Sequence, residues 1–109
     1  MIPLPPWQER ANAVGKAYVY LLRSSSTGRF YVGWTTDIKR RLEEHNMGKS
    51  QYTRSRGPWK LIGYETYLNS ESAKERERKL KHNPKSLFYF KKRALATLRV
   101  SAATQQTGR

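Results

Sequence analysis

The pattern of apolar and polar positions along the chain predicts three β-strands. Residues 17–22 are aromatic, β-branched and apolar, and residues 30–34 repeat this character after a cluster of turn-forming residues at 24–28. The two segments are therefore expected to form a β-hairpin. Residues 59–67 predict a third strand, in which Gly63 marks a weak point or a bulge.

The first helix is expected between the hairpin and the third strand. It begins at Asp37, an acidic residue suited to the positive end of a helix dipole, and Thr36 is the expected cap. It runs to about Asn46 and ends before Gly48.

Two more helices are expected after the third strand. Residues 69–81 have helical character, with Ser72 and Glu75 spaced as a capping box. Pro84 stops or bends this helix, and residues 87–98 form a last, basic helix. The order ββαβαα predicts an α+β fold in which helices cover a small three-stranded sheet.

Charge is the strongest compositional feature. The 109 residues suffice for one domain, and they include 22 Lys and Arg against 8 Asp and Glu, a formal net charge of +14. A field of this sign attracts polyanions, which makes nucleic acid the expected partner. Small ribosomal and nucleoid proteins that catalyse nothing are equally basic, and basic surfaces also bind anionic membranes, so charge alone does not indicate an enzyme.

The residue types that the chain lacks exclude several kinds of catalytic and metal site. The chain has no cysteine and two histidines, which excludes disulfides, zinc knuckles and thiol catalysis. Any metal is expected to be held mainly by oxygen, which favours Mg²⁺ or Mn²⁺. No apolar run is long enough to span a membrane, and we expect a cytoplasmic, nucleoid-associated protein. Residues 1–15 are expected to be an irregular arm, residues 16–98 the domain and residues 99–109 a flexible tail.

Glu77 is the acidic residue with the most informative position. At about 100° per residue, it lies about 40° from Ala73 and about 60° from Leu80, on the only apolar stripe of its helix. Glu71 and Glu75 point away from that stripe. A carboxylate facing the core needs a metal, hydrogen-bond donors or a cation. Both a metal site and an ion pair with a nearby Arg or Lys fit this position.

Arg41 and His45 lie four residues apart beside the apolar stripe defined by Ile38 and Leu42. An arginine there can hold a phosphate through two donors, and a neutral histidine can accept or orient a proton. The alternatives are a solvated arginine and a packed histidine.

The hairpin carries its tyrosines on defined faces. Tyr18, Tyr20 and Leu22 share one face of the first strand, and Tyr31 and Gly33 share a face of the second. Taken one at a time, these tyrosines are expected to serve packing. Their spacing as a set changes that expectation.

The set resembles the GIY-YIG nuclease superfamily, and above all its short, single-domain bacterial members. Tyr20 precedes Tyr31 by eleven residues, Gly33 completes Tyr-Val-Gly, and Arg41 follows eight residues later. Residues 73–81 resemble the helix that carries the family's metal-binding glutamate. The resemblance covers about residues 16–95. It departs from the family at Tyr18, which replaces the glycine of the first motif.

The resemblance implies an endonuclease that hydrolyses phosphodiester bonds with one divalent cation, Mg²⁺ or Mn²⁺, on a three-stranded antiparallel sheet flanked by helices. Its candidate catalytic residues are Tyr20, Tyr31, Arg41, His45 and Glu77, with Glu77 as the metal ligand. The family pattern favours Tyr20 as the general base, provided that nearby cations lower its pKa, while His45 is the alternative base. Asn83 is a weak counterpart of a family asparagine.

Substrate contacts are expected from the basic loop at 49–60 and from aromatic residues. The predicted nucleic-acid-binding residues are Lys49, Arg54, Arg56, Lys60 and Trp34, with Tyr52 and Trp59 also available for stacking. We expect low sequence specificity and DNA as the favoured nucleic acid over RNA. The alternative function is a non-catalytic nucleic-acid-binding module on the same fold. Nothing in the sequence indicates an oligomeric state.

Overall fold

The computed structural model describes residues 16–107, with side chains described as far as residue 96. Its elements are β1 (Ala17–Ser24), β2 (Phe30–Thr35), α2 (Ile38–Asn46), β3 (Trp59–Tyr67), α3 (Ser70–His82) and α4 (Pro84–Thr107). This order confirms the predicted α+β fold, ββαβαα. The expected arm at 1–15 lies outside the described residues, and α4 continues beyond its expected end at Leu98.

The three strands form an antiparallel sheet in the order β2-β1-β3, so β1 is central. Tyr20 pairs with Gly33 on β2 and with Tyr64 on β3. The expected irregularity near Gly63 is present, because Leu21 pairs with Gly63 while Leu22 pairs with Leu61. One residue of β3 is thus skipped at a bulge.

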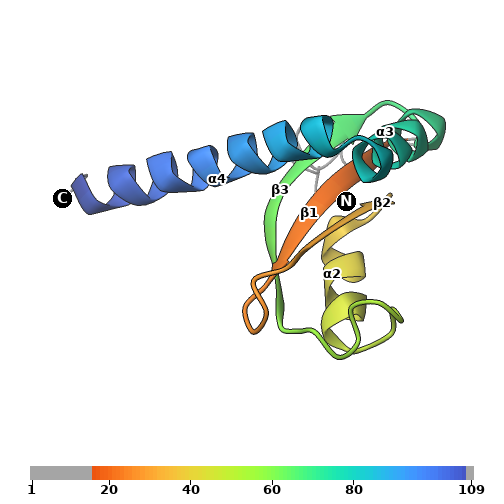
Figure 1. Ribbon diagram of the computed structural model, residues 1–109, viewed down its shortest axis with the longest axis horizontal. Helices are drawn as coiled ribbons and strands as arrows, with labels where there is room; N and C mark the ends of the chain where they lie inside the picture. The colour runs from red at the N-terminus through yellow and green to blue at the C-terminus, as the bar shows by residue number, and fades with distance from the viewer. Residues whose placement is uncertain (1–15, 108–109) are drawn as a thin grey trace, which may run out of the picture.

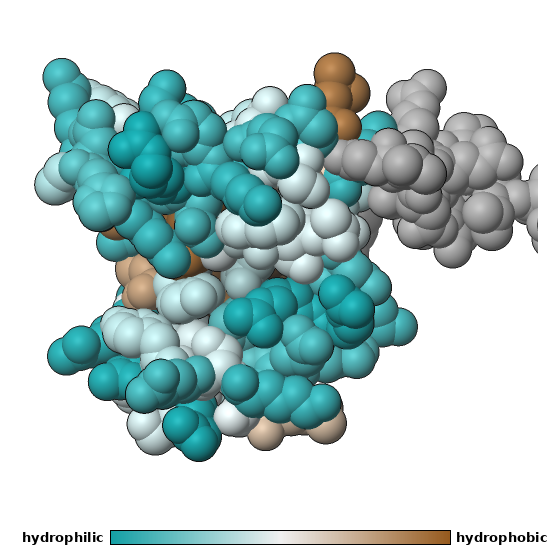
Figure 2. Space-filling view, turned by 90° about the vertical axis from the view of Figure 1, so that its right-hand side faces the viewer, coloured by the Kyte–Doolittle hydropathy of each residue, from teal (hydrophilic) through white to brown (hydrophobic). Residues whose placement is uncertain are grey.

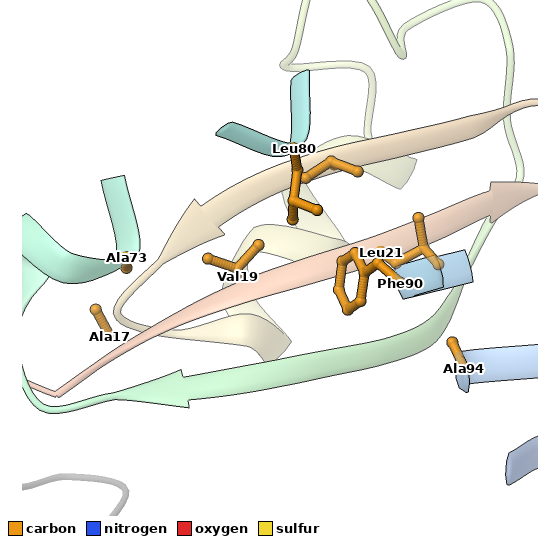
Figure 3. Close-up of a cluster of buried hydrophobic side chains, with 8 residues drawn as sticks. Ala17, Val19, Leu21, Ala73, Leu80, Phe90 and Ala94 are labelled. Atoms are coloured by element: carbon orange, nitrogen blue, oxygen red, sulfur yellow. The ribbon is translucent and has the colours of Figure 1, made fainter. Parts of the chain in front are cut away.

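The two faces of the sheet are covered differently (Figure 1). On one face, alternate residues of β1 pack against α3 and α4 in a core of Ala17, Val19, Leu21, Val32, Ala73, Leu80, Phe90 and Ala94 (Figure 3). On the other face a smaller cluster of Tyr20, Leu22 and Trp59 packs against Tyr31, Leu42 and Leu61. The predicted alternation of faces along β1 is therefore confirmed, and the tyrosines lie on the α2 side.

Capping differs from the expectation at two helices. Asp37, not Thr36, caps α2: its backbone is extended and its carboxylate accepts from the Arg40 N–H at 3.1 Å. Asn69 caps α3, and its side-chain oxygen accepts from the Ser72 N–H at 2.8 Å. The prediction of a capping box formed by Ser72 and Glu75 was therefore wrong.

The remaining helix ends follow their sequence signals. Gly48, at φ 79°, takes the left-handed conformation after α2 that glycine adopts without strain. Pro84 does not bend a helix but opens α4, a position where the missing N–H costs nothing. Asn83 accepts from the Ser86 N–H at 3.1 Å and so contributes to the start of α4.

Candidate active site

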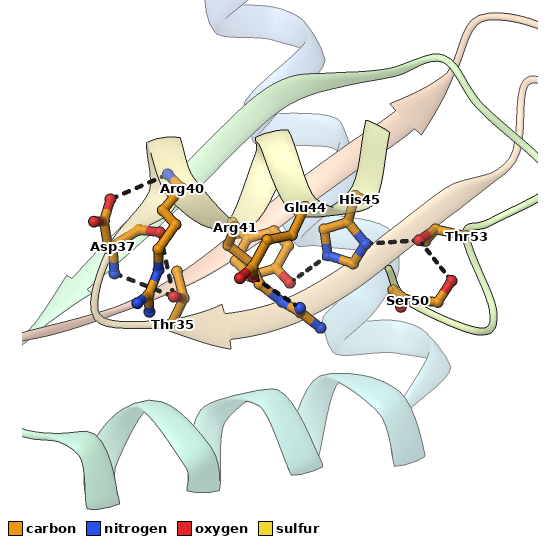
Figure 4. A network of polar contacts seen from close by, with 9 residues as sticks. Thr35, Asp37, Arg40, Arg41, Glu44, His45, Ser50 and Thr53 are labelled. Carbon is orange, nitrogen blue, oxygen red and sulfur yellow. Dashed lines mark hydrogen bonds and ion pairs between the residues drawn. The ribbon is translucent and has the colours of Figure 1, made fainter. Parts of the chain in front are cut away.

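A chain of hydrogen bonds links β1, α2 and the loop before β3. The Tyr20 hydroxyl lies 2.8 Å from His45 Nε2, and His45 Nδ1 lies 2.7 Å from the Thr53 hydroxyl oxygen (Figure 4). All three side chains are buried, with His45 at 1% exposure. His45 is thus held between two hydroxyl groups. Although it lies beside the apolar stripe of α2, both of its ring nitrogens make polar contacts.

Gly33 makes room for this tyrosine. A Cβ built on Gly33 would stand 2.5 Å from Cζ of Tyr20, closer than carbon atoms approach. The glycine of the Tyr-Val-Gly segment therefore lets the Tyr20 ring lie over the backbone of β2, within reach of His45.

We expect Gly33→Ala to lower the free energy of unfolding by about 1–3 kcal/mol, the usual cost of overpacking. Urea denaturation measures this change. In a Tyr20→Ala background the same substitution should cost clearly less, because the clashing ring is gone. An equal cost in both backgrounds would show that the Tyr20 ring is not what requires glycine.

Tyr31 lies at the centre of an aromatic cluster beside the hydrogen-bonded chain. Its ring centroid is 4.9 Å from that of His45 and 6.3 Å from that of Tyr20. On another side it stacks with Tyr52 at 5.7 Å. Tyr52 is 44% exposed, so the stack leads from the buried histidine to the surface.

Arg41 extends from α2 toward α3 (Figure 4). Its guanidinium pairs with Glu44 at 3.1 Å and is half-buried. It also lies close enough to the Tyr20 hydroxyl to counteract the rise in the pKa of that group. Arg41 is therefore a cation beside the tyrosine oxygen, not a solvated side chain remote from the site.

Glu77 approaches the site from α3, on the other face of the sheet. It is half-buried, as its place between the buried residues Ala73 and Leu80 predicts. It pairs with Lys81 at 3.7 Å, and the Lys81 ammonium lies 5.3 Å from the Tyr31 ring centroid. The negative charge of Glu77 also raises the pKa of Tyr20. The ion pair considered from the sequence is thus formed, and the carboxylate still acts electrostatically on Tyr20.

Burial sets the protonation of the two central groups. Burial raises the pKa of Tyr20 to about 12, and Tyr31 and Glu77 act in the same direction against the lowering effect of Arg41. Burial, with Arg41 nearby, lowers the pKa of His45 to about 4. The side chains of the protein do not meet the condition that nearby cations lower the pKa of Tyr20, because desolvation outweighs Arg41. At neutral pH both side chains are uncharged.

Comparison with known proteins shows the family to which the chain belongs. Residues 16–93 match the family model described as the GIY-YIG catalytic domain. The chain belongs to the GIY-YIG family. A UPF0213 protein of Streptococcus pneumoniae is 46% identical over 67 residues, 61% of this chain and 67% of that protein. A UPF0213 protein of Haloquadratum walsbyi is 40% identical over 80 residues, 72% of this chain and 84% of that protein.

One solved structure is similar to this GIY-YIG chain, the solution NMR structure of a UPF0213 protein from Bacillus halodurans. It is 36% identical, covers 70% of this chain and 85% of its own, and has a TM-score of 0.43. The family match indicates nuclease-type activity on a nucleic-acid substrate, for which GIY-YIG nucleases typically use a divalent metal ion.

The donors of this GIY-YIG domain fit a hard cation that takes most of its ligands from water and substrate. Among residues 16–107 no three His, Cys, Asp or Glu side chains gather into a metal cluster. Glu77 is a single carboxylate, and Mg²⁺ is commonly held by one or two carboxylates together with waters and substrate phosphates. Glu77 could therefore hold such an ion, with waters and substrate phosphate oxygens as its other ligands.

The predicted nucleic-acid-binding residues of the GIY-YIG domain lie in different places. Lys49, Arg54 and Lys60 are exposed, on or next to the loop between α2 and β3. Arg56 lies 4.5 Å from the Tyr52 ring centroid, at the outer end of the aromatic stack. Trp34 packs on the opposite face of the sheet, where Lys74 lies 5.1 Å from its ring centroid, so the structure does not bring it to the tyrosines.

Two features of the loop differ from the sequence interpretation. Trp59, expected to be available for stacking, is only 2% exposed, and its indole N–H donates to the Thr53 carbonyl at 2.9 Å. Thr53 itself was not identified from the sequence. Its only sequence signal is a threonine within a basic loop, and its contact with His45 depends on how that loop folds back.

The low pKa of His45 has a consequence for stability. A group whose folded pKa of about 4 lies below its ordinary 6.5 stabilises the fold above pH 6.5 and loses that contribution as pH falls toward 4. The contribution is about 3 kcal/mol. Urea denaturation between these pH values should show the decline, and His45→Gln should remove it. His82→Gln, at an exposed position, should keep it. An unchanged decline in His45→Gln would assign it to other groups.

The outer surface suits a polyanionic partner. Figure 2 shows a face covered mainly by hydrophilic residues, and the chain carries a formal net charge of +14. No helix within the described part of the chain combines the length and apolar character needed to cross a membrane.

Proposed function

We propose that this protein is a divalent-metal-dependent endonuclease that hydrolyses phosphodiester bonds with low sequence specificity, in DNA rather than RNA. The observation that supports it best is the convergence of residues from three elements. Tyr20, hydrogen-bonded to a neutral histidine, lies beside Arg41 of α2 and within electrostatic reach of Glu77 of α3. A basic protein that only binds nucleic acid has no need of this arrangement.

The proposed proton route runs from the attacking water to Tyr20 and from Tyr20 to His45. As the water oxygen bonds to phosphorus, its proton passes to the Tyr20 oxygen, while the Tyr20 proton passes to Nε2 of His45. Tyr20 stays neutral overall, which suits a hydroxyl whose pKa is raised. His45 becomes an imidazolium, and the bond to the departing 3′-oxygen breaks with its electron pair. This route uses both candidate bases in series.

Two residues are proposed to stabilise the negative charge that develops on the phosphate, Arg41 directly and Glu77 through a metal ion. The Arg41 guanidinium offers paired donors to the equatorial oxygens, where negative charge accumulates. Glu77 would hold the Mg²⁺ or Mn²⁺ ion, which when bound polarises the phosphate and offsets charge on the leaving oxygen. Lys81, now paired with Glu77 at 3.7 Å, would be displaced toward solvent, where it is 43% exposed.

Substrate binding is assigned to the charged loop and the exposed end of the aromatic stack. Lys49, Arg54 and Lys60 can neutralise backbone phosphates, and Tyr52 offers a ring at the surface. These contacts are to the backbone or to any base, so they favour low sequence specificity.

The proposal is tested by cleavage of labelled single-stranded, duplex and branched DNA and of RNA. Each substrate is incubated with Mg²⁺, with Mn²⁺ and with chelator. Cutting of DNA that requires the metal supports the proposal and ranks the substrates. Salt-dependent binding to all of them without any cutting would instead establish a non-catalytic binding module.

A further inference from the structure

We propose that Thr53 is a positioning residue that fixes the tautomer of His45, placing the imidazole proton on Nδ1 and leaving Nε2 free to accept the proton of Tyr20. Thr53 does not reach the substrate and acts only through the histidine. Its role in the reaction rests on the proposed function, whereas the tautomer itself does not.

The direction of the hydrogen bonds follows from the donors that each group has. The Thr53 hydroxyl has one proton, and the carbonyl of Ser50 accepts it at 3.4 Å. The Thr53 oxygen can then only accept from His45, so the short contact of 2.7 Å requires a proton on Nδ1. A neutral imidazole with its proton on Nδ1 has a lone pair on Nε2, which lies 2.8 Å from the Tyr20 hydroxyl.

The opposite tautomer of His45 leaves the Tyr20 proton without an acceptor in the part of the chain that the structure describes. If Thr53 donated to Nδ1, Nε2 would carry the proton and donate to the Tyr20 oxygen, on which Arg41 also acts as a donor. Among the described residues the Tyr20 proton would then have no acceptor, and the Ser50 carbonyl would lose the Thr53 donor. Buried polar groups without partners cost free energy, so the first arrangement is favoured.

Thr53 is held rigidly enough to set a tautomer. It is 0% exposed, and its carbonyl accepts from the Trp59 indole N–H at 2.9 Å. Trp59 is in turn fixed to the end of α2, since its backbone N–H donates to the Asn46 side chain at 2.7 Å. The loop before β3 is thus joined to α2 at two points, by the contact between Thr53 and His45 and by the contact between Trp59 and Asn46. Surrounding hydrogen bonds of this kind orient a catalytic imidazole.

The test uses ¹⁵N NMR of the two histidine rings in the whole protein at neutral pH, with Thr53→Val and Thr53→Ser as a matched pair. His45 and His82 are the only histidines, so His82→Gln assigns the signals. We expect the wild type and Thr53→Ser to show a protonated Nδ1 and an unprotonated Nε2 at His45. We expect Thr53→Val, which keeps the shape but lacks the hydroxyl, to shift the proton toward Nε2.

Cleavage kinetics give the second readout. We expect Thr53→Val to lower kcat by about 10–100-fold with KM nearly unchanged, and Thr53→Ser to restore it. A wild-type His45 protonated on Nε2 overturns the proposal even if Thr53→Val fails to fold. So does a Thr53→Val spectrum with the wild-type tautomer, or a Thr53→Ser variant that resembles Thr53→Val. If the wild type cuts no nucleic acid but shows the expected tautomer, the proposed function fails and the assignment of Thr53 stands.

Discussion

Glu77→Gln should lower the rate of metal-dependent cleavage by about 10²–10³-fold, the equivalent of several kcal/mol of transition-state stabilisation. The substitution keeps the size of the side chain and its place on α3, but removes the charge that a hard cation requires. Binding of nucleic acid should persist or strengthen slightly, because a negative charge leaves a basic surface. Single-turnover cleavage and equilibrium binding, measured on the same substrate, separate the two effects.

Glu75→Gln is the matched control for this change. Glu75 lies on the same helix two residues away, is exposed, and pairs with Arg78 at 2.6 Å on the outer surface. We expect it to cut at the wild-type rate. Equal losses in both variants would assign the effect to the net charge or stability of α3, and no loss in Glu77→Gln would remove Glu77 from the site.

Tyr20→Phe should lower kcat by about 10²–10⁴-fold, the range that a positioned acid or base contributes. The ring still packs over Gly33, but the oxygen that receives the water proton and the donor to His45 are both gone. Loss of the hydroxyl also leaves Nε2 of His45 unpaired in a buried place. We therefore expect a modest loss of stability, of about 1–3 kcal/mol.

Tyr64→Phe is the corresponding control. Tyr64 pairs with Tyr20 across the sheet and is 55% exposed, so it tests the loss of a hydroxyl from the neighbouring strand. It should keep nearly wild-type cleavage and stability. A Tyr20→Phe protein that folds and cuts normally would exclude the Tyr20–His45 proton route, and His45 would then have to act on water directly.

Periodicity and turn chemistry predicted most of the fold. The alternation of apolar residues in β1 placed Tyr20 and Val19 on opposite faces, and β3 has the bounds that residues 59–67 indicated. The helix caps were harder to predict from the sequence, because neighbouring residues such as Thr36 and Asp37 have similar capping chemistry. Which one caps depends on the path of the chain as it leaves β2.

The sequence predicted several of the side chains that the structure brings together, but not Thr53, the place of Trp34 or the electrostatics. Helix geometry placed Glu77 toward the interior, and spacing combined with family resemblance selected Tyr20, Tyr31 and Arg41. The raised pKa of Tyr20 could not be predicted, because composition reveals the surrounding cations but not the burial that outweighs Arg41. Thr53 was missed for a related reason: its contact with His45 spans a loop whose path is set by Trp59 and Asn46.

Manganese-induced broadening of backbone amide NMR signals tests most directly whether these residues form one metal-dependent centre, since it requires no knowledge of the natural substrate. The proposed site predicts that Mn²⁺ broadens signals around Glu77, at Tyr31 on the edge strand β2 and at Tyr20 on the central strand β1. It also predicts that Glu77→Gln abolishes this broadening while Glu75→Gln preserves it. Broadening centred on another acidic residue such as Glu65, with the signals of Tyr20 and Tyr31 unaffected, would contradict a metal centre at Glu77.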